Sequence, residues 1–281
     1  MAMTINTNVN SLTAQRNASA NQSSLSTSIA RLSSGLRVNS AKDDAAGLAI
    51  ATRMDAQARG MTVAIRNAND GVSMLQTAES GMQTVSDMLQ RMRELAVQAT
   101  NSTNTSSDVS SLNQEYTQLA SEIGRTISAV QFNGTSLLTT SGNGFDFQVG
   151  ANSGQTINIG SAALNLDQST NVTAVYAGSQ SALNTTTNSS NAGNIDAIDK
   201  ALQSINDSRA SLGAAQSRFQ NTVSFLQSAV ENQTAAKGRI MDADFASETA
   251  NLSRAQILQQ AGTAMIAQAN QLPQGVLSLL R

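Results

Sequence analysis

The sequence predicts a mainly α-helical protein made of long coiled-coil helical rods, with a small β-hairpin region near the middle. Eleven apolar residues from Met61 to Ala96 cover 35 residues in ten steps. Their mean spacing of 3.5 residues is the period of a coiled-coil seam. Aromatic residues make up only 3% of the chain, so its 40% of apolar residues are mostly the Ala, Leu, Ile, Val and Met that fill helix seams.

The first half of the chain predicts three helices. An apolar seam at 5–36 indicates the first, and the seam at 61–96 indicates the second. A polar, glycine-bearing junction at 33–47 separates them. The all-polar stretch 101–107 predicts a turn, and apolar residues at helical spacing over 109–130 then predict a third helix.

The middle third, residues 131–194, differs because it holds eight of the 18 glycines. Asn133-Gly134 predicts a tight turn. Apolar residues alternate over 145–149 and again over 157–159, which predicts a β-hairpin. Residues 179–194 are mostly Ser, Thr and Asn, and they predict an exposed, weakly specified loop, with disorder as the alternative.

The last third predicts two more helices. Apolar spacing indicates one over 195–230 and one over 258–279, with a polar junction at 237–244. Amphipathic helices at opposite ends of the chain would pair with each other. Burial contributes only about 0.8 kcal/mol per methylene, whereas ordering the backbone costs roughly 1–2 kcal/mol per residue. We therefore expect a lone terminal pair to need neighbours.

The composition excludes most catalytic chemistry. The chain has no Cys and no His, so it lacks a thiolate nucleophile, a His-containing triad, a disulfide framework and a structural zinc site. The carboxylate pairs Asp43–Asp44 and Asp242–Asp244 have no further oxygen ligands around them, and we expect solvated turns there. We expect no enzyme activity, no cofactor and no metal. The net charge of −2 shows no excess of basic residues of the kind that binds the phosphates of nucleic acid.

No targeting or spanning segment is evident. The apolar runs fall far short of the roughly 20 residues needed to cross a bilayer, so we expect no membrane insertion. The first charged residue is Arg16, so the N-terminus lacks the basic flank of a secretory signal. A secreted destination would therefore need a non-Sec export route.

Several long segments resemble the signatures of bacterial flagellin. The matching segments are 6–19 (NTNVNSLTAQRNAS), 33–51 (SSGLRVNSAKDDAAGLAIA), 89–101 (LQRMRELAVQATN), 132–138 (FNGTSLL), 145–159 (FDFQVGANSGQTINI) and 267–281 (AQANQLPQGVLSLLR). The chain looks like a short flagellin without large outer inserts. The alternatives are a hook–filament junction (hook-associated) protein, which shares similar terminal helices, an enzyme carried on a flagellin scaffold, and a cytosolic coiled-coil scaffold.

The resemblance implies an inner domain, D0, formed by 1–43 and 241–281, and a surrounding D1 formed by 44–130, 131–194 and 195–240. It also implies a subunit that self-assembles into the extracellular helical filament of the bacterial flagellum and serves swimming motility. The chain would be exported unfolded by the flagellar type III apparatus. Implied partners are other flagellin subunits, hook–filament junction proteins, a filament cap and an export chaperone on the C-terminal segment.

The resemblance also implies two sets of functional residues. Arg91, Leu95 and Glu115 match positions bound by the host Toll-like receptor that senses flagellin; the alternative is a solvated helix face with local ion pairs. Ser and Thr residues of 179–194 either carry O-linked sugars or form an unmodified loop. The expected polymerisation seams are formed by Ile5, Val9, Leu12, Leu25, Ile29, Leu32, Leu36, Leu258, Met265, Leu272, Val276, Leu279 and Leu280.

Overall fold

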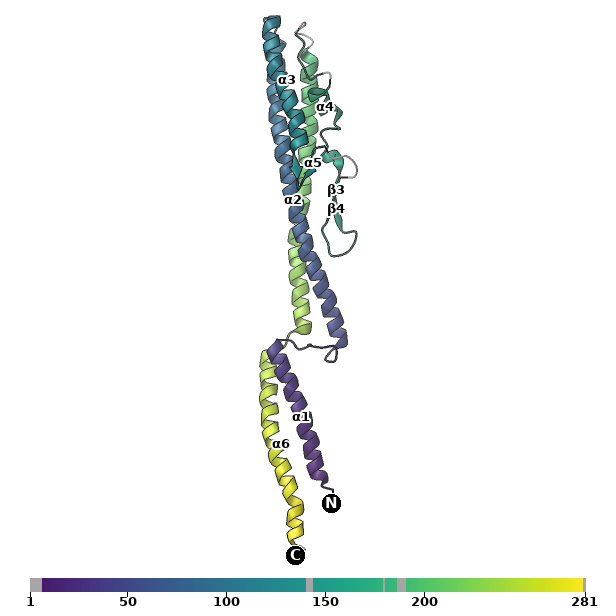
Figure 1. Ribbon diagram of the computed structural model, residues 1–281, viewed down its shortest axis with the longest axis vertical. Coiled ribbons are helices and arrows are strands. Elements are labelled where there is room, and N and C mark those ends of the chain that lie inside the picture. The colour runs from purple at the N-terminus through teal and green to yellow at the C-terminus, as the bar shows by residue number, and fades with distance from the viewer. Residues whose placement is uncertain (1–6, 140–143, 179, 186–190, 280–281) are drawn as a thin grey trace. The chain divides into compact units, whose positions relative to one another are not determined.

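The computed structural model describes residues 7–139, 144–178, 180–185 and 191–279, and of 272–279 it describes the backbone. Helices make up most of it (Figure 1). The chain divides into two compact units. Unit 1 joins the two ends of the chain, 1–56 and 232–281, and unit 2 is the continuous span 57–231. The mainly helical fold predicted from the sequence is confirmed.

Unit 1 is built on the antiparallel pair of α1 (Val9–Ser34) and α6 (Phe245–Leu279). The start of α1 is capped by Asn8, whose side chain accepts a hydrogen bond from the backbone N–H of Ser11. Its end is marked by Gly35, which adopts the left-handed conformation with φ 72°. The two terminal helices therefore pair with each other, as their seams predict.

Backbone contacts join the segment that follows α1 to the segment that precedes α6, both within unit 1. Leu36 and Asp242 form an isolated antiparallel bridge, and Arg37 donates its backbone N–H to the carbonyl of Met241 at 2.6 Å. The helices α2 (Ala45–Ala99) and α5 (Ala192–Met241) extend into the polar junctions that the sequence predicts at 33–47 and 237–244. Both junctions are consequently shorter than predicted.

Unit 2 encloses one continuous apolar core. The core lies between the larger part of α2, α3 (Ser106–Ala129) and the larger part of α5. Thr105 and Asp108 form a capping box that starts α3. The hydroxyl of Thr105 accepts from the backbone N–H of Asp108, and the carboxylate of Asp108 accepts from the backbone N–H of Thr105. Tyr116 and Phe219 are the largest fully buried side chains. The predicted long helices and the turn before α3 are confirmed.

Two hairpins follow α3. Strands β1 (Gln131–Phe132) and β2 (Thr135–Ser136) flank Asn133 and Gly134, whose φ angles of 49° and 78° are those of a type I′ turn. Strands β3 (Phe145–Gln148) and β4 (Thr156–Ile159) pair antiparallel, with Phe147 opposite Ile157. The predicted turn and hairpin are confirmed.

The β3–β4 hairpin packs against the helices of unit 2. Its loop approaches α2 at Gly60, where an added Cβ would lie 2.9 Å from the Cβ of Ala151. The Phe147 ring packs edge-on against Phe219 of α5, with centroids 5.4 Å apart. A Cβ added to Gly71 of α2 would lie 2.9 Å from the ring of Phe219. Asn67 donates to the backbone carbonyl of Gln148 at 3.0 Å. The hairpin is thus part of the core of unit 2.

The predicted exposed loop at 179–194 is only partly exposed where the structure describes it: 180–185 contain no helix or strand, 192–194 belong to α5, and three of the described residues are buried. Leu183 is buried, and its N–H donates to Asn113 of α3 at 2.7 Å. Asn191 and Asn194 are also buried, and each bonds backbone groups of 182–184. Amide side chains bond the backbone of 182–184, so part of this polar segment is buried. The rest of the predicted loop, 179 and 186–190, lies outside the described residues.

The segment before it is folded as well. A short 3-10 turn, η1 (Ser161–Ala163), leads to α4 (Thr170–Tyr176), a helix that the sequence analysis missed. Val172 and Val175 of α4 are fully buried in the core of unit 2. Seven residues are too few to show a helical period, which explains the omission.

Candidate assembly and recognition surfaces

Side-chain amides fix the register of the α1–α6 pair. Asn8 donates to the carbonyl of Ala269 at 2.7 Å, and Asn21 donates to the carbonyl of Ala255 at 2.8 Å. A third contact joins Gln259 and Gln22 at 2.8 Å. Because these bonds connect fixed positions on both helices, they oppose a slide of one helix along the other.

The bond from Asn8 compensates for the single proline of the chain, Pro273. In an α-helix the carbonyl of residue 269 would accept from the N–H of residue 273, and proline has no N–H. α6 nevertheless continues to Leu279. The side-chain amide of Asn8 donates to the carbonyl of Ala269 in place of the missing N–H, and Ala269 is buried. The proline therefore creates an acceptor on α6 that α1 occupies.

The apolar contacts of the pair are few. Leu25, Ala255 and Ala269 are its buried apolar residues among those described on α1 and α6. Several large apolar side chains stay in solvent instead, with exposed fractions from 52% to 65%. They are Val9, Leu12, Ile29, Phe245, Ile257, Leu258 and Met265.

The predicted seam residues fall into three groups. Leu25 is buried, while Leu32 and Leu36 are half-buried. Five others are exposed: Val9, Leu12, Ile29, Leu258 and Met265. Ile5 and Leu280 lie outside the described residues, as do the side chains of Leu272, Val276 and Leu279. Sequence reasoning did not single out Phe245 and Ile257, which lie on α6 outside the residues chosen for their spacing.

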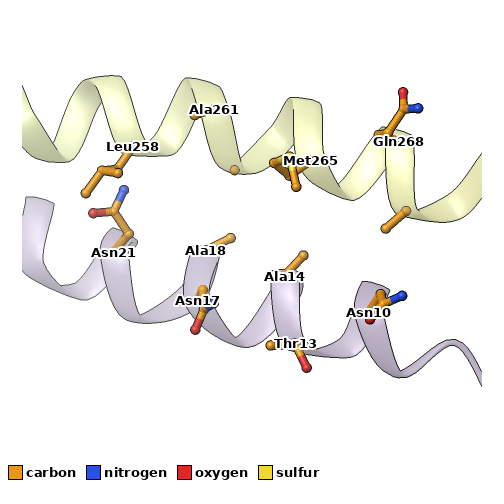
Figure 2. Close-up of a pocket in the computed structure, with 12 residues that line it drawn as sticks. Asn10, Thr13, Ala14, Asn17, Ala18, Asn21, Leu258, Ala261, Met265 and Gln268 are labelled. Carbon is orange, nitrogen blue, oxygen red and sulfur yellow. The ribbon is translucent and has the colours of Figure 1, made fainter. Parts of the chain in front are cut away.

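A groove of about 600 Å³ runs between α1 and α6 (Figure 2). Small residues line much of it, including Ala14 and Ala18 on α1 and Gly262 on α6. Leu258 and Met265 supply its large apolar side chains. No charged residue lines this groove. The surface is therefore suited to apolar contact and not to a charged ligand.

The predicted recognition patch lies on unit 2, where α2 faces α3. Arg91 donates to Glu115 of α3 at 2.8 Å and to Glu94 on its own helix at 2.8 Å. Both carboxylates raise the pKa of Arg91, Glu115 most strongly. Nearby, Arg93 donates to Asp199 of α5 at 2.7 Å and lowers the pKa of that carboxyl. These exposed ion pairs link α2 to both neighbouring helices.

Leu95 does not share that surface. Its side chain is 1% exposed and belongs to the apolar core of unit 2. α2 contacts helices on two sides, so its buried stripe is wider than the single seam read from the spacing. The structure therefore brings Arg91 and Glu115 together on the surface and places Leu95 in the core.

The carboxylates near the junctions cap helices. Asp44 accepts from the N–H of Gly47 at 2.8 Å at the start of α2, and Asp244 accepts from the N–H of Ala246 at 3.0 Å at the start of α6. Hydrogen bonds from Ser247 and from Ala246 lower the pKa of Asp244. In the described part of the chain, no group of three potential ligands could hold a metal ion.

None of the described helices is both long enough and apolar enough to span a bilayer. This includes α6, in which no charged residue follows Arg254 up to its end at Leu279.

Two family models match most of the chain. The model of the bacterial flagellin N-terminal helical region matches residues 5–143, and the model of the bacterial flagellin C-terminal helical region matches residues 195–280.

Whole-length relatives carry the same description. A flagellin of Halalkalibacterium halodurans is 46% identical over 279 residues, which cover 99% of this chain and 100% of that protein. A flagellin of Xenorhabdus nematophila is 44% identical over 318 residues, with 100% of both chains covered. Among solved structures, Bacillus cereus flagellin is 32% identical, covers 61% of this chain and 94% of its own, and gives a TM-score of 0.49.

Proposed function

The chain belongs to the bacterial flagellin family, and from this premise we propose that it polymerises through the helix pair of unit 1. Flagellins are structural subunits of the flagellar filament, which is extracellular, and they are not enzymes. The proposal concerns which residues of this chain form the contacts between subunits. We assign that role to the exposed apolar side chains of α1 and α6.

One observation carries the proposal, namely the uneven distribution of exposed apolar side chains. Among the described residues, the large apolar side chains exposed in unit 2 are Val63, Val97 and Phe225. Those exposed in unit 1 are Val9, Leu12, Ile29, Ile50, Phe245, Ile257, Leu258 and Met265. Unit 1 therefore has fewer buried apolar residues than unit 2, and more large apolar side chains that are exposed. Contacts with further copies would cover this set of exposed side chains.

Burial of this set also supplies the free energy that the pair lacks. Fully burying one large apolar side chain contributes about 1.5–3 kcal/mol. Covering several of them on each subunit would offset a large part of the cost of ordering α1 and α6. The ends of the chain would therefore fold fully only when subunits assemble, as for a segment that folds on binding.

A pair of substitutions on α6 tests the assembly surface. Leu258→Ser removes an exposed apolar side chain, and Gln256→Ser is the matched control two residues earlier on the same exposed stretch. We expect Leu258→Ser to raise the monomer concentration needed for seeded polymerisation about tenfold or more. Sedimentation measures this concentration. Equal polymerisation of both variants would remove the helix pair from the assembly surface.

Truncation tests the end of the same helix. Deleting residues 267–281 should leave a soluble, mostly helical protein that neither seeds nor extends filaments. Normal pelleting of polymer from the truncated chain would contradict the proposal. The full-length chain also distinguishes the two family alternatives. A filament subunit should keep extending filaments for as long as monomer is supplied, whereas the assembly of a hook–filament junction protein stops.

We further infer the route and the partners of assembly from family membership. The chain leaves the cell unfolded through the flagellar type III apparatus, with an export chaperone on its C-terminal segment. Hook–filament junction proteins and a filament cap contact the assembling subunits, and rotation of the filament drives swimming. Cells with an inactive flagellar export apparatus should retain the chain. Its secretion by such cells would refute this route.

We also propose that Arg91 and Glu115 contribute to a surface bound by the flagellin-sensing Toll-like receptor of a host. Both side chains are exposed and are held by an ion pair between two helices. Arg91→Ala and Glu115→Ala in purified monomer should weaken receptor signalling in a reporter cell line. The control is Arg125→Ala, which breaks an exposed ion pair with Glu122 within α3. Unchanged signalling by both patch variants would refute the assignment.

Leu95 needs a separate readout because it is buried. Leu95→Ala should lower the free energy of unfolding of unit 2 by about 2–5 kcal/mol. Any loss of signalling in this variant should therefore follow its loss of stability. Strong signalling loss with unchanged stability would instead indicate direct contact with the receptor.

A further inference from the structure

Met265 is the one exposed methionine among those that the structure describes. Its exposed fraction is 62%, whereas Met74, Met82 and Met92 are at most 2% exposed. The other described methionines are half-buried: Met54, Met61, Met88 and Met241. Met1 and Met3 lie outside the described residues. Solvent therefore reaches the sulfur-bearing side chain of Met265 far more readily than the buried ones.

The chain offers an oxidant few other targets. It has ten Met and neither Cys nor Trp, so the thioethers are its only sulfur atoms and its most readily oxidised groups. Tyr116 is fully buried. The combination of an exposed thioether with a chain free of thiols directs two-electron oxidation to Met265.

The side chain also occupies a position where polarity matters. Met265 projects from α6 toward α1, where Ala14 and Ala18 face it across the groove, while Thr13 and Asn17 point away (Figure 2). Leu258 lies two turns earlier along the same groove. The thioether is therefore part of the apolar surface to which the assembly role is assigned.

We propose that Met265 is an oxidation site for peroxides, and that its sulfoxide prevents the monomer from polymerising. In the reaction a lone pair of the sulfur attacks one oxygen of hydrogen peroxide, so an S–O bond forms as the O–O bond breaks. The sulfur is oxidised to the sulfoxide, the peroxide is reduced, and the departing hydroxide takes the remaining proton to become water. This inference rests on the proposed assembly function of the helix pair.

The sulfoxide acts through its oxygen. In the monomer, water donates hydrogen bonds to that oxygen at little cost. In the polymer, a second copy of the chain covers the groove and removes this water, and a buried acceptor without a donor is unfavourable. Assembly also covers the unmodified thioether. Oxidation therefore affects subunits before assembly and spares those already in a filament.

The test treats purified full-length monomer with graded hydrogen peroxide, followed by catalase. Peptide mass spectrometry then gives the sulfoxide fraction at each methionine, and seeded polymerisation is followed by sedimentation. We expect Met265 to oxidise many-fold faster than Met82 and Met92, and the critical concentration to rise about tenfold or more in step with Met265 sulfoxide. Assembled filaments given the same dose should keep Met265 reduced.

Two controls attribute the effect to this residue. In Met265→Leu the ratio of critical concentrations after and before peroxide should stay near one, whatever the starting value. Treating the oxidised unmodified chain with methionine sulfoxide reductases should restore polymerisation. Oxidation of Met265 no faster than of Met82, full polymerisation of Met265-oxidised chain, or an equal peroxide effect in Met265→Leu would each overturn the inference. Failure of untreated monomer to polymerise on seeds would instead count against the assembly function itself.

Discussion

The two units of the molecule use the same kind of amphipathic helix, but they bury very different fractions of it. In unit 2 three helices, α4 and a hairpin enclose a continuous core that contains Tyr116 and Phe219. In unit 1 each terminal helix has one long partner, and large side chains such as Leu12 and Leu258 remain in solvent. Apolar periodicity thus shows that a helix has a face to bury, while the number of neighbours in the chain decides whether it is buried.

The polar contacts sharpen the difference. In unit 1 the bonds from Asn8 and Asn21 set the register of a thinly packed pair. An intramolecular hydrogen bond contributes only about 0.5–1.5 kcal/mol net. Such contacts specify how the helices align, but they do not replace the missing apolar core. If the proposed assembly surface is right, other subunits supply the remaining stability of unit 1.

The largest expected difference concerns local opening of the free monomer. Residues 1–43 and 241–281 should be lost to limited proteolysis while 57–231 resists, because exchange and cleavage follow the local free energy of opening. Amides of α1 and α6 should exchange orders of magnitude faster than those of α3. Circular dichroism should show added helix on polymerisation. Equal protease resistance of the monomer's ends would show that the pair is stable alone.

Two phenylalanines on α5 allow the loss of a buried ring to be compared with the loss of an exposed one. Phe219→Ala removes a fully buried ring and its contact with Phe147, and should lower the free energy of unfolding by about 3–5 kcal/mol. Phe225→Ala changes a side chain that is 69% exposed, and should shift it by no more than about 0.5 kcal/mol. Denaturant unfolding of the monomer measures both. Similar losses would mean that unit 2 does not carry its own core.

Two helical glycines probe how tightly unit 2 is packed. An added Cβ at Gly71 would lie 2.9 Å from Phe219, so Gly71→Ala should destabilise by about 1–3 kcal/mol. Gly213 has open space around it, so Gly213→Ala should stabilise by up to about 1 kcal/mol through helix propensity. Thermal unfolding of both variants distinguishes these signs. Stabilisation by Gly71→Ala would show that the ring of Phe219 can move away from α2.

The proline compensation in unit 1 gives a smaller, assembly-dependent effect. Asn8→Asp keeps an acceptor for the start of α1 but removes the donor to Ala269, and should weaken polymerisation by about 1–3 kcal/mol. Asn21→Asp should do less, because position 259 is not proline and α6 supplies its own N–H to Ala255. Critical concentrations give both values. Adding Pro273→Ala should shrink the effect of Asn8→Asp, and an undiminished effect would contradict the compensation.

The smallest expected effect is a dependence on acidity. The pKa of Asp244 at the start of α6 and that of Asp108 at the start of α3 both lie below the ordinary 3.8 because the charged forms accept hydrogen bonds. Such groups stabilise the fold above the unfolded-state pKa, and this contribution is lost as the pH falls through the folded-state value. Titration by NMR should place both midpoints below 3.8. Asp244→Asn should flatten the loss of α6 helix between neutral and acidic pH.

The sequence predicts the parts of this fold that repeat or use a distinctive turn. The seam of α2, the hairpin of β3 and β4 and the Asn133-Gly134 turn are all local patterns. What it misses depends on tertiary contacts. Burial of Leu95 follows from α2 having neighbours on two sides, and the folding of the segment around Leu183 follows from amides supplied by other parts of unit 2.

The candidate surfaces show the same division. Apolar spacing selects Leu258 and Met265, which the structure leaves exposed. Spacing alone does not distinguish them from Leu25, which is buried in the pair. The exposed Ile257 is adjacent to Leu258 and therefore falls outside the selected spacing. The relation between Asn8 and Pro273 is not visible in the sequence, because it joins residues from opposite ends of the chain.

That distance along the chain has a consequence for the order of folding. The bond from Asn8 to Ala269 joins residues 261 positions apart. Closing so long a flexible loop costs on the order of 5 kcal/mol of chain entropy, more than a few hydrogen bonds return. Once 57–231 has folded, however, that loop is already closed and only the short ends remain to be brought together. The middle of the polypeptide thus acts as an intramolecular tether, and it should have to fold before its own first and last helices can find each other.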